Sequence, residues 1–203
     1  MSEPGGGRRG SGPPVGAVLA GGRGSRIGGA KALVELAGRP LISYPLAAVE
    51  EAGLEPVVVA KADSELPPLS CRVIREPEPT PHPLCGIVAA LRFACERALV
   101  VVGCDMPFTG AALLASLGTA PEPLVVTSVG GRVQPLPARY DAALLPALEE
   151  ALASERALRA TLESLRPRVI EETELARFGD PRRLCFNVNT RADVERAARL
   201  ARA

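Results

Sequence analysis

The sequence predicts an α/β fold in three layers, with helices covering both faces of a doubly wound, mostly parallel sheet. Short apolar runs alternate with helical patterns along the chain, the runs are apolar without interruption, and glycine-rich or polar segments follow two of them. Uninterrupted apolar runs are typical of strands buried on both faces, and their alternation with helices is typical of a parallel sheet. Ligands of such sheets bind at the carboxyl ends of the strands, so functional residues are expected there.

The expected strands and helices alternate from residue 15 onward. We expect strands at Val15–Ala20, Val57–Ala60, Arg72–Arg75, Ala98–Gly103 (the central strand) and Leu124–Ser128, and helices at Leu41–Glu51, Leu84–Glu96, Ala111–Leu117 and Asp141–Ala153. Pro45 is expected to break or kink its helix, because a proline lacks the N–H that bonds to the preceding turn. Pro135 and Pro137 interrupt a further possible strand, Arg132–Arg139, so an edge or a bulge is expected there rather than the centre of the sheet.

Two helices near the C-terminus have clear amphipathic patterns. The helix over 141–153 presents a leucine face made of Leu144, Leu145, Leu148 and Leu152. The last helix is expected to begin at Thr190, because Thr190 and Asp193 have the spacing of a capping box. Its buried side would consist of Val194, Ala197, Ala198 and Ala201.

Length, composition and charge restrict the class of protein. A chain of 203 residues with 47% hydrophobic residues fits one domain, expected over 15–203, with a core that needs neither disulfides nor a structural metal. A formal net charge of +1 and the absence of tryptophan argue against a nucleic-acid binder. No apolar run approaches the roughly 18 residues of a membrane span. The 5 cysteines are never spaced C-x-x-C, which favours a reducing cytoplasm over a disulfide framework or a zinc site.

Residues 1–14 are rich in glycine, arginine and proline and contain no apolar segment. We therefore expect a disordered N-terminal tail rather than a signal peptide. The Arg8-Arg9 pair lacks the hydrophobic segment that follows a twin-arginine signal. These features favour a cytoplasmic location.

A glycine-rich loop follows the first expected strand and reads LAGGRGSRIGGAK over 19–31. Glycines let backbone N–H groups approach a ligand closely, and Arg23, Arg26 and Lys31 add positive charge, a combination that suits a triphosphate. The Walker A motif is absent because no Ser or Thr follows Lys31, and the dinucleotide fingerprint is absent because Ile27 replaces its third glycine. A flexible surface loop is the alternative, but three cations directly after a buried strand favour phosphate binding.

An aspartate, Asp105, follows the central expected strand in the segment GCDMPF. A carboxylate leaving a buried strand is costly unless it is paired or binds a cation. Nucleotide enzymes typically hold Mg²⁺ with one or two carboxylates and phosphate oxygens, so Asp105 is a candidate Mg²⁺ ligand. The alternative is a cap for the helix that opens near Thr109.

Two asparagines in the segment FNVNT form a third candidate site. Strand-like alternation places Asn187 and Asn189 on one side of the chain, so both amides can face one ligand. Asn189 and Thr190 also suit a turn and a helix cap, which explains Thr190 but not Asn187.

His82 is the only histidine and is flanked by two prolines. Without a partner cysteine or acid at ligand spacing, we expect it in a surface loop rather than as a catalytic base. A nucleophilic triad cannot be assembled around it, which disfavours covalent hydrolysis.

Together these segments resemble the molybdenum cofactor guanylyltransferase family (molybdopterin-guanine dinucleotide biosynthesis protein A) of the GT-A-like nucleotidyltransferases, over nearly the whole chain from Val15. LAGGRGSRIGGAKAL is similar to the family's LAGG-x-S-x-RMGG-x-DK loop, GCDMPF to its CDMP segment, PLCG to its GPLAG helix start and FNVNTRADVERA to its closing FNVNTPED. The loop alone indicates only a broad superfamily, whereas its conjunction with FNVNT is far more specific. The resemblance implies the Rossmann-like fold of the nucleotide-diphospho-sugar transferases.

The resemblance also implies a reaction and its residues. The terminal phosphate of molybdenum–molybdopterin would attack the α-phosphorus of GTP, giving molybdopterin guanine dinucleotide and pyrophosphate, with Mg²⁺ as cofactor held by Asp105. The implied catalytic residues are Lys31, Arg23, Arg26 and Asp105. The implied nucleotide-binding residues are Leu19, Ala20, Gly21, Gly22, Lys31, Glu76, Gly86 and Asp105, and the implied acceptor-binding residues are Asn187 and Asn189. GTP and molybdenum–molybdopterin are the expected small-molecule partners, and cofactor-delivery or molybdoenzyme chaperone proteins are the possible protein partners. The protein is expected to be a monomer or a weak oligomer.

The sequence departs from the family pattern at four residues, and its glycine-rich loop is one residue shorter. Ala30 stands where an Asp usually precedes the lysine, Ala60 where an Asn is usual, Glu76 where an Asp is usual and His82 where a Gly is common. Nucleotidyl transfer stays the expected chemistry, but these departures weaken the argument that the nucleotide base is guanine rather than cytosine. A molybdopterin cytidylyltransferase, a sugar-phosphate nucleotidyltransferase and a degenerate nucleotide-binding assembly partner therefore stay open as alternatives.

Overall fold

The computed structural model describes residues 12–22, 27, 29–76 and 82–202 of the chain, and the structural statements below concern these residues. A seven-stranded sheet has the order β5-β4-β1-β6-β8-β7-β9. Its strands are β1 Val15–Leu19, β4 Glu55–Ala60, β5 Arg72–Arg75, β6 Leu99–Gly103, β7 Leu124–Val129, β8 Arg132–Tyr140 and β9 Arg168–Ile170. Four neighbouring pairs are parallel and two, β6–β8 and β7–β8, are antiparallel, so the predicted mostly parallel sheet is confirmed.

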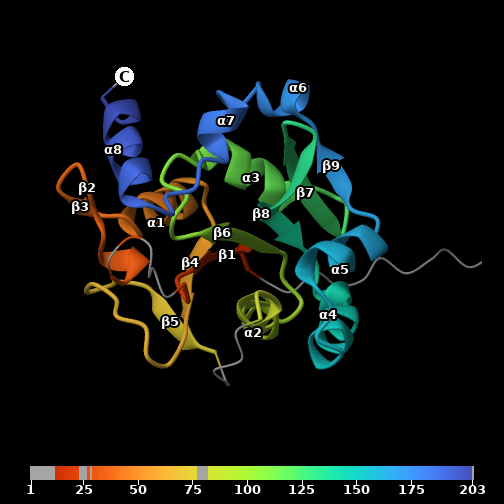
Figure 1. Ribbon diagram of the computed structural model, residues 1–203. Helices are drawn as coiled ribbons and strands as arrows, with labels where there is room; N and C mark the ends of the chain where they lie inside the picture. Colours follow the sequence, from red (N-terminus) through yellow and green to blue (C-terminus); the bar gives the residue numbers. More distant parts are fainter. Residues whose placement is uncertain (1–11, 23–26, 28, 77–81, 203) are drawn as a thin grey trace, which may run out of the picture.

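Helices cover both faces of this sheet, as predicted. The main ones are α1 Ser43–Glu51, α2 Leu84–Ala94, α3 Ala111–Thr119, α4 Leu145–Ala153, α5 Leu158–Ser164 and α8 Arg191–Leu200, with short helices α6 Glu172–Leu175 and α7 Pro181–Leu184. Figure 1 shows α1 and α3 above the sheet and α2 and α4 below it. The remaining elements are the hairpin of β2 Glu35–Leu36 and β3 Arg39–Pro40, and the 3₁₀ turns Lys31–Leu33 and Ala142–Leu144.

The core consists of two apolar layers, one on each face of the sheet. Val18 and Val100 point into the layer shared with α1 and α3, and Ala17 and Val101 into the layer shared with α2 and α4. Because successive side chains of a strand alternate between faces, a run without polar residues supplies both layers at once. At Gly16, α1 packs so closely that a Cβ would lie 2.3 Å from Val49 Cγ1.

The strand β8 corrects one prediction from the sequence. It lies inside the sheet between β6 and β7, not at an edge. Its pairing with β7 shifts register between Val125 and Thr127, and Pro135 and Pro137 fall in that interval. The expected bulge is therefore confirmed, and it lets an interior strand carry two prolines, because their missing N–H groups fall outside the regular ladder.

Two helix predictions also need correction. Pro45 does not break α1, because the helix begins only at Ser43 and the proline sits in its first turn, where N–H groups have no partner within the helix. In α8 only Ala197 is buried, while Ala201 is exposed. The helix lies at the periphery of the molecule (Figure 1), so its neighbours cover a narrow stripe of it.

The described chain begins within the expected N-terminal tail. Residues 1–11 lie outside the described part, whereas the Pro13 and Pro14 carbonyls accept hydrogen bonds from Arg97 and from the Glu55 N–H. Within the described residues, no helix is both long enough and apolar enough to cross a membrane.

Candidate active site

The carboxyl ends of β1 and β6 form the base of the candidate site. The two strands run parallel with Leu19 opposite Gly103, and the Cys104 N–H donates to the Leu19 carbonyl at 3.0 Å. A Cβ on Gly103 would lie 2.4 Å from Asp105 Oδ1. Glycine at this position therefore allows the carboxylate to fold back beside the strand end.

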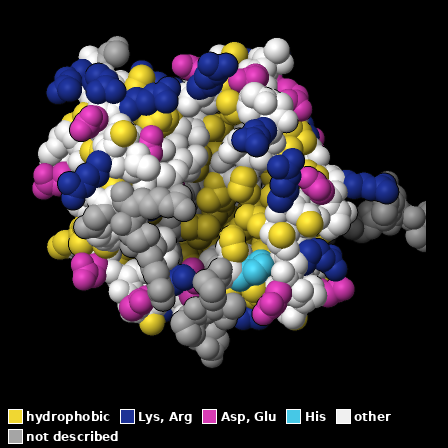
Figure 2. Space-filling model, viewed as in Figure 1, with side chains coloured by type: hydrophobic (Ala, Val, Ile, Leu, Met, Phe, Trp, Pro, Cys, Tyr) yellow, Lys and Arg dark blue, Asp and Glu magenta, His cyan; other side chains and the backbone are white. Residues whose placement is uncertain are grey.

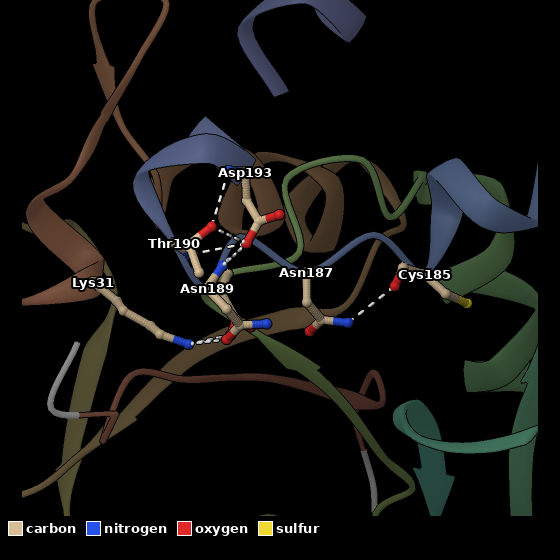
Figure 3. Close-up of polar contacts among 7 residues, drawn as sticks. Lys31, Cys185, Asn187, Asn189, Thr190 and Asp193 are labelled. Carbon is tan, nitrogen blue, oxygen red and sulfur yellow. Dashed lines mark hydrogen bonds and ion pairs between the residues drawn. The ribbon is translucent and has the colours of Figure 1, made fainter. Parts of the chain in front are cut away.

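Lys31 joins two of the predicted segments. Its Nζ donates to Asp105 Oδ2 at 2.7 Å and to Asn189 Oδ1 at 2.6 Å, the second contact being drawn in Figure 3. The Lys31 and Asp105 side chains are 16% and 18% exposed, so this ion pair is shielded more than a surface pair but remains open to a ligand. Asp105 does not cap α3, whose N-cap is Gly110, and the capping alternative for Asp105 is wrong.

The C-terminal asparagines reach the site on an extended segment. Figure 3 shows the side chains of Asn187 and Asn189 projecting to the same side, as alternation predicted. Between them, the buried Val188 donates its N–H to the Asp105 carbonyl at 2.8 Å, which ties the segment to the end of β6. Asn187 Nδ2 donates to the Cys185 carbonyl at 3.0 Å, which leaves its Oδ1 for another partner.

A cavity of about 520 Å³ lies beside this cluster. Figure 2 shows the molecule hollowed here, with apolar side chains inside the hollow. Its lining includes the predicted residues Leu19, Gly21, Gly22, Glu76, Gly86 and Asp105. A second cavity, of about 460 Å³, shares Gly21 and Gly22 with the first and is lined further by Ala20, Lys31 and the Asp63–Glu65 segment. The two hollows therefore meet at Gly21 and Gly22.

Glu76 lies at the wall of the larger cavity, against two glycines. Its Oε1 lies 3.0 Å from the position of a Cβ on Gly21 and 3.2 Å from that of a Cβ on Gly86. Burial raises the pKa of the Glu76 carboxyl, and the positive charge of Lys61 lowers it in part. Side chains at either glycine would press on this carboxyl, so the glycines keep the space in front of it open.

Sequence reasoning missed two polar side chains of the cavity wall. Lys61 directly follows β4 and lines the wall, and its position after a buried strand, as one of only two lysines, was a signal that was not used. His82, expected in a surface loop, is half-buried and lines the same cavity. Its Nδ1 accepts from the Leu84 N–H at 3.2 Å, and its Nε2 lies 3.0 Å from the Arg156 carbonyl. The ring therefore connects the start of α2 to the segment before α5.

Two predicted residues cannot be compared, because Arg23 and Arg26 lie outside the described residues. The part of the chain that is described contains no group of three or more side chains able to enclose a metal ion. Asp105 offers a single carboxylate. That is the donor set expected where Mg²⁺ is held mainly by substrate phosphates and water, so the residues present fit a nucleotide-bound Mg²⁺ but not a metal enclosed by protein ligands alone.

Comparisons with known proteins show the family of the chain. Residues 16–169 match the family described as MobA-like NTP transferase domain. A molybdenum cofactor guanylyltransferase from Xanthomonas euvesicatoria is 38% identical over 157 residues, which are 75% of this chain and 80% of that protein. A probable molybdenum cofactor guanylyltransferase from Pelotomaculum thermopropionicum is 31% identical over 92% of this chain and 93% of its own length.

Solved structures extend the agreement to the fold. The molybdopterin-guanine dinucleotide biosynthesis protein A from Archaeoglobus fulgidus superposes with a TM-score of 0.78 at 27% identity, over 92% of this chain and 98% of that one. The 2-C-methyl-D-erythritol 4-phosphate cytidylyltransferase from Thermus thermophilus, at 20% identity and a TM-score of 0.67 over 94% of this chain and all of that one, shares the fold. On these matches, the chain belongs to the MobA-like NTP transferases, in the molybdenum cofactor guanylyltransferase family.

Proposed function

We propose that the protein transfers GMP from GTP to the terminal phosphate of molybdenum–molybdopterin, giving molybdopterin guanine dinucleotide and pyrophosphate. The observation that carries this proposal is the position of Lys31, which contacts both Asp105 and Asn189 beside the larger cavity. Family membership supplies the identity of the two substrates. The cysteine pattern supports a cytoplasmic location for this reaction.

The chemistry requires charge neutralisation more than a reactive side chain. An oxygen of the acceptor phosphate forms a bond to the α-phosphorus, and the bond from that phosphorus to the bridging oxygen breaks as pyrophosphate leaves with the electron pair. Lys31 would offset the negative charge that grows on the pyrophosphate, and the backbone N–H groups of Gly21 and Gly22 would face the phosphates. Asn187 and Asn189 would orient the acceptor phosphate, so positioning accounts for most of the rate enhancement.

Asp105 is the residue that would hold Mg²⁺. The ion would neutralise phosphate charge when it is bound with the nucleotide. In the structure, Asp105 Oδ2 is paired with Lys31. Mg²⁺ and Lys31 would therefore use the same carboxylate. A nucleotide that brings both negative phosphates and Mg²⁺ would provide a partner for each.

Glu76 would read the nucleoside. An ionised carboxylate only accepts hydrogen bonds, so it suits neighbouring N–H donors. Guanine presents two such donors side by side, a ring N–H and an exocyclic amino group, whereas cytosine presents an amino group beside an acceptor nitrogen. The Glu76 carboxyl in the cavity wall thus supports guanine despite the usual Asp at this position of the family.

Calorimetric binding of GTP, CTP, ATP and UTP with Mg²⁺ tests the proposal, on the wild type and on Asp105→Ala. We expect a selective GTP response that is strongly weakened in the variant, followed by pyrophosphate release when molybdenum–molybdopterin is added to the wild type. Preferential binding of CTP would indicate that the protein is a cytidylyltransferase instead. Absence of any nucleotide response would identify a degenerate nucleotide-binding partner instead.

A further inference from the structure

The carboxylate of Asp193, in the first turn of α8, makes more hydrogen bonds than a helix cap requires. Its Oδ2 accepts from the Thr190 N–H at 2.8 Å and from the Thr190 hydroxyl at 2.8 Å, while the Asp193 N–H donates to that hydroxyl. These contacts complete the predicted capping box. The same oxygen also accepts from the Asn189 N–H at 3.1 Å, a residue that precedes the helix cap (Figure 3).

The extra bond holds the backbone of a site residue. Asn189 follows Val188, whose N–H donates to the Asp105 carbonyl at 2.8 Å. The chain on the two sides of the Val188 carbonyl is thus fixed by Asp105 and by Asp193. Since the backbone is held at both points, the side-chain amide of Asn189 is directed to Lys31, and its Oδ1 lies 2.6 Å from Lys31 Nζ.

A second aspartate in the chain provides the contrast. Asp180 caps α7, and its Oδ1 accepts from the Arg182 N–H at 2.9 Å. It performs the same local task at a helix start, but it contacts neither Asn189 nor Lys31 in the described structure. Any effect of Asp193 beyond that of Asp180 therefore measures something other than capping.

The surroundings keep Asp193 charged in the folded protein. Burial by itself would raise the pKa of this carboxyl, but the hydrogen bonds from Thr190 and Asn189, together with the charge of Arg196, hold the pKa below its ordinary value. A charged acceptor binds N–H donors more strongly than a neutral one. The bond to the Asn189 N–H is thereby strengthened.

We infer that Asp193 is a positioning residue for nucleotidyl transfer. Through its hydrogen bond to the Asn189 backbone, it orients the Asn189 side-chain amide, which holds Lys31 beside Asp105. This inference rests on the proposed function for its catalytic consequence, but its structural part, the restraint of Lys31, stands without any substrate. It assigns to α8 a task beyond packing, because the helix start is built into the site.

The two lysines of the chain allow a direct test. Amine-selective acylation, followed peptide by peptide by mass spectrometry, reports on Lys31, while Lys61 serves as an internal control. In Asp193→Ala we expect Lys31 to react about threefold faster or more and Lys61 to react as in the wild type, because Lys31 loses its restrained partner. In Asp180→Ala both lysines should react as in the wild type. Unchanged Lys31 reactivity in a folded Asp193→Ala protein would overturn the inference, whatever the enzyme's substrates are.

Kinetics supply the second arm. We expect Asp193→Ala to lower the rate of GMP transfer about tenfold and Asp180→Ala to leave it within twofold, although each variant loses a hydrogen bond at a helix start and should melt at lower temperature. In the Asn189→Ala background, Asp193→Ala should cost less than twofold more, because the two residues act in series. If the rate loss of the double variant instead equals the product of the two single-variant losses, Asp193 acts independently of Asn189. If wild type binds no nucleotide, the proposed function fails while the labelling result still decides the inference.

Asp193→Asn covers the case in which the alanine variant does not fold. It keeps one oxygen that accepts hydrogen bonds but loses the charge, so we expect a Lys31 reactivity between those of wild type and Asp193→Ala. Two results together would leave capping as the entire role of Asp193. They are wild-type Lys31 reactivity in Asp193→Asn, and a wild-type rate of GMP transfer in an Asp193→Ala protein whose folding is confirmed by circular dichroism.

Discussion

Two of the carboxyl groups in the site, those of Asp105 and Glu76, have different surroundings. Asp105 forms an ion pair of 2.7 Å with Lys31, which also donates to Asn189. Glu76 instead lies against two glycines at the cavity wall, and burial raises its pKa while Lys61 lowers it in part. One carboxylate is thus part of an assembled ionic cluster, and the other is a desolvated group that faces open space.

This difference indicates how an elongated substrate would lie. A cluster that already balances one lysine against one aspartate can exchange these partners for phosphates and a metal at small cost in reorganisation. A desolvated carboxyl gains most from uncharged N–H or O–H donors, which repay its lost hydration. Under the proposed function, the triphosphate therefore lies toward Asp105 and the nucleoside toward Glu76.

Removing the carboxylate at the ionic end should have the largest effect. We expect Asp105→Ala to lower the rate of GMP transfer by about 10³-fold or more, because Lys31 loses its partner and the metal its ligand. Chelation of divalent metal should produce a comparable loss in the wild type. Pyrophosphate release measures both, and a variant that keeps near-normal activity would remove Asp105 from the metal site. A circular dichroism spectrum like that of the wild type is the control for folding.

Removing the cation should cost somewhat less. Lys31→Ala is expected to weaken triphosphate binding and to slow transfer by about 10²-fold, since one of several positive groups is lost. Lys61→Ala is the matched control, because Lys61 lines the cavity on the side of Glu76; we expect it to change nucleotide affinity with little effect on the rate at saturation. Equal effects of both variants would contradict the division of the site into two ends.

The uncharged analogue Glu76→Gln tests the nucleoside end. We expect about tenfold weaker GTP binding, or ~1.4 kcal/mol, because an acceptor is replaced by a group that also donates. The response to pyrophosphate, which has no nucleoside, should stay unchanged. Calorimetry with both ligands distinguishes the ends, and loss of pyrophosphate binding in this variant would show that Glu76 serves the phosphates instead.

Gly86→Ala should have a smaller effect in the same direction. The added Cβ would lie 3.2 Å from both Glu76 Oε1 and Leu19 Cδ2, so the carboxyl must shift by a few tenths of an ångström. We expect about threefold weaker GTP binding with no loss of thermal stability, since alanine favours the helix more than glycine does. A matching fall in melting temperature would indicate damage to α2 rather than to the cavity.

The pH dependence of stability provides the last comparison. Because the folded protein raises the pKa of Glu76, its contribution to stability is fully present below the unfolded-state pKa and is lost as the pH rises through the folded-state pKa. The free energy of unfolding of the wild type should therefore fall over this range relative to that of Glu76→Gln. Urea unfolding between about pH 4 and pH 8 checks this sign, and parallel curves would contradict it.

The phosphate end was readable from the sequence, and most of the other end was not. Asp105 directly follows a buried run, and Lys31 ends the glycine-rich loop that leaves another. Parallel strands bring their carboxyl ends together, so the pattern places both residues at the same edge of the sheet. Lys61 and His82 line the same cavity. Lys61 directly follows β4, so the sequence pattern did offer a signal for it, whereas His82 belongs to a loop whose direction no periodicity determines. The interior position of β8 is likewise not readable from the sequence, because prolines argue against an interior strand and only the register shift with β7 accommodates them.

The sequence by itself determined the α/β class, the mostly parallel sheet, the helix capped by Thr190 and the residue types that meet at the strand ends. These depend on local periodicity and on short motifs, which act over a few residues. Only the tertiary structure decided that Asn189 meets Lys31 across 158 positions of sequence, that Asp193 holds Asn189 and that Glu76 lies between two glycines. Those contacts depend on how distant segments pack, and packing is a property of the whole fold rather than of any one segment.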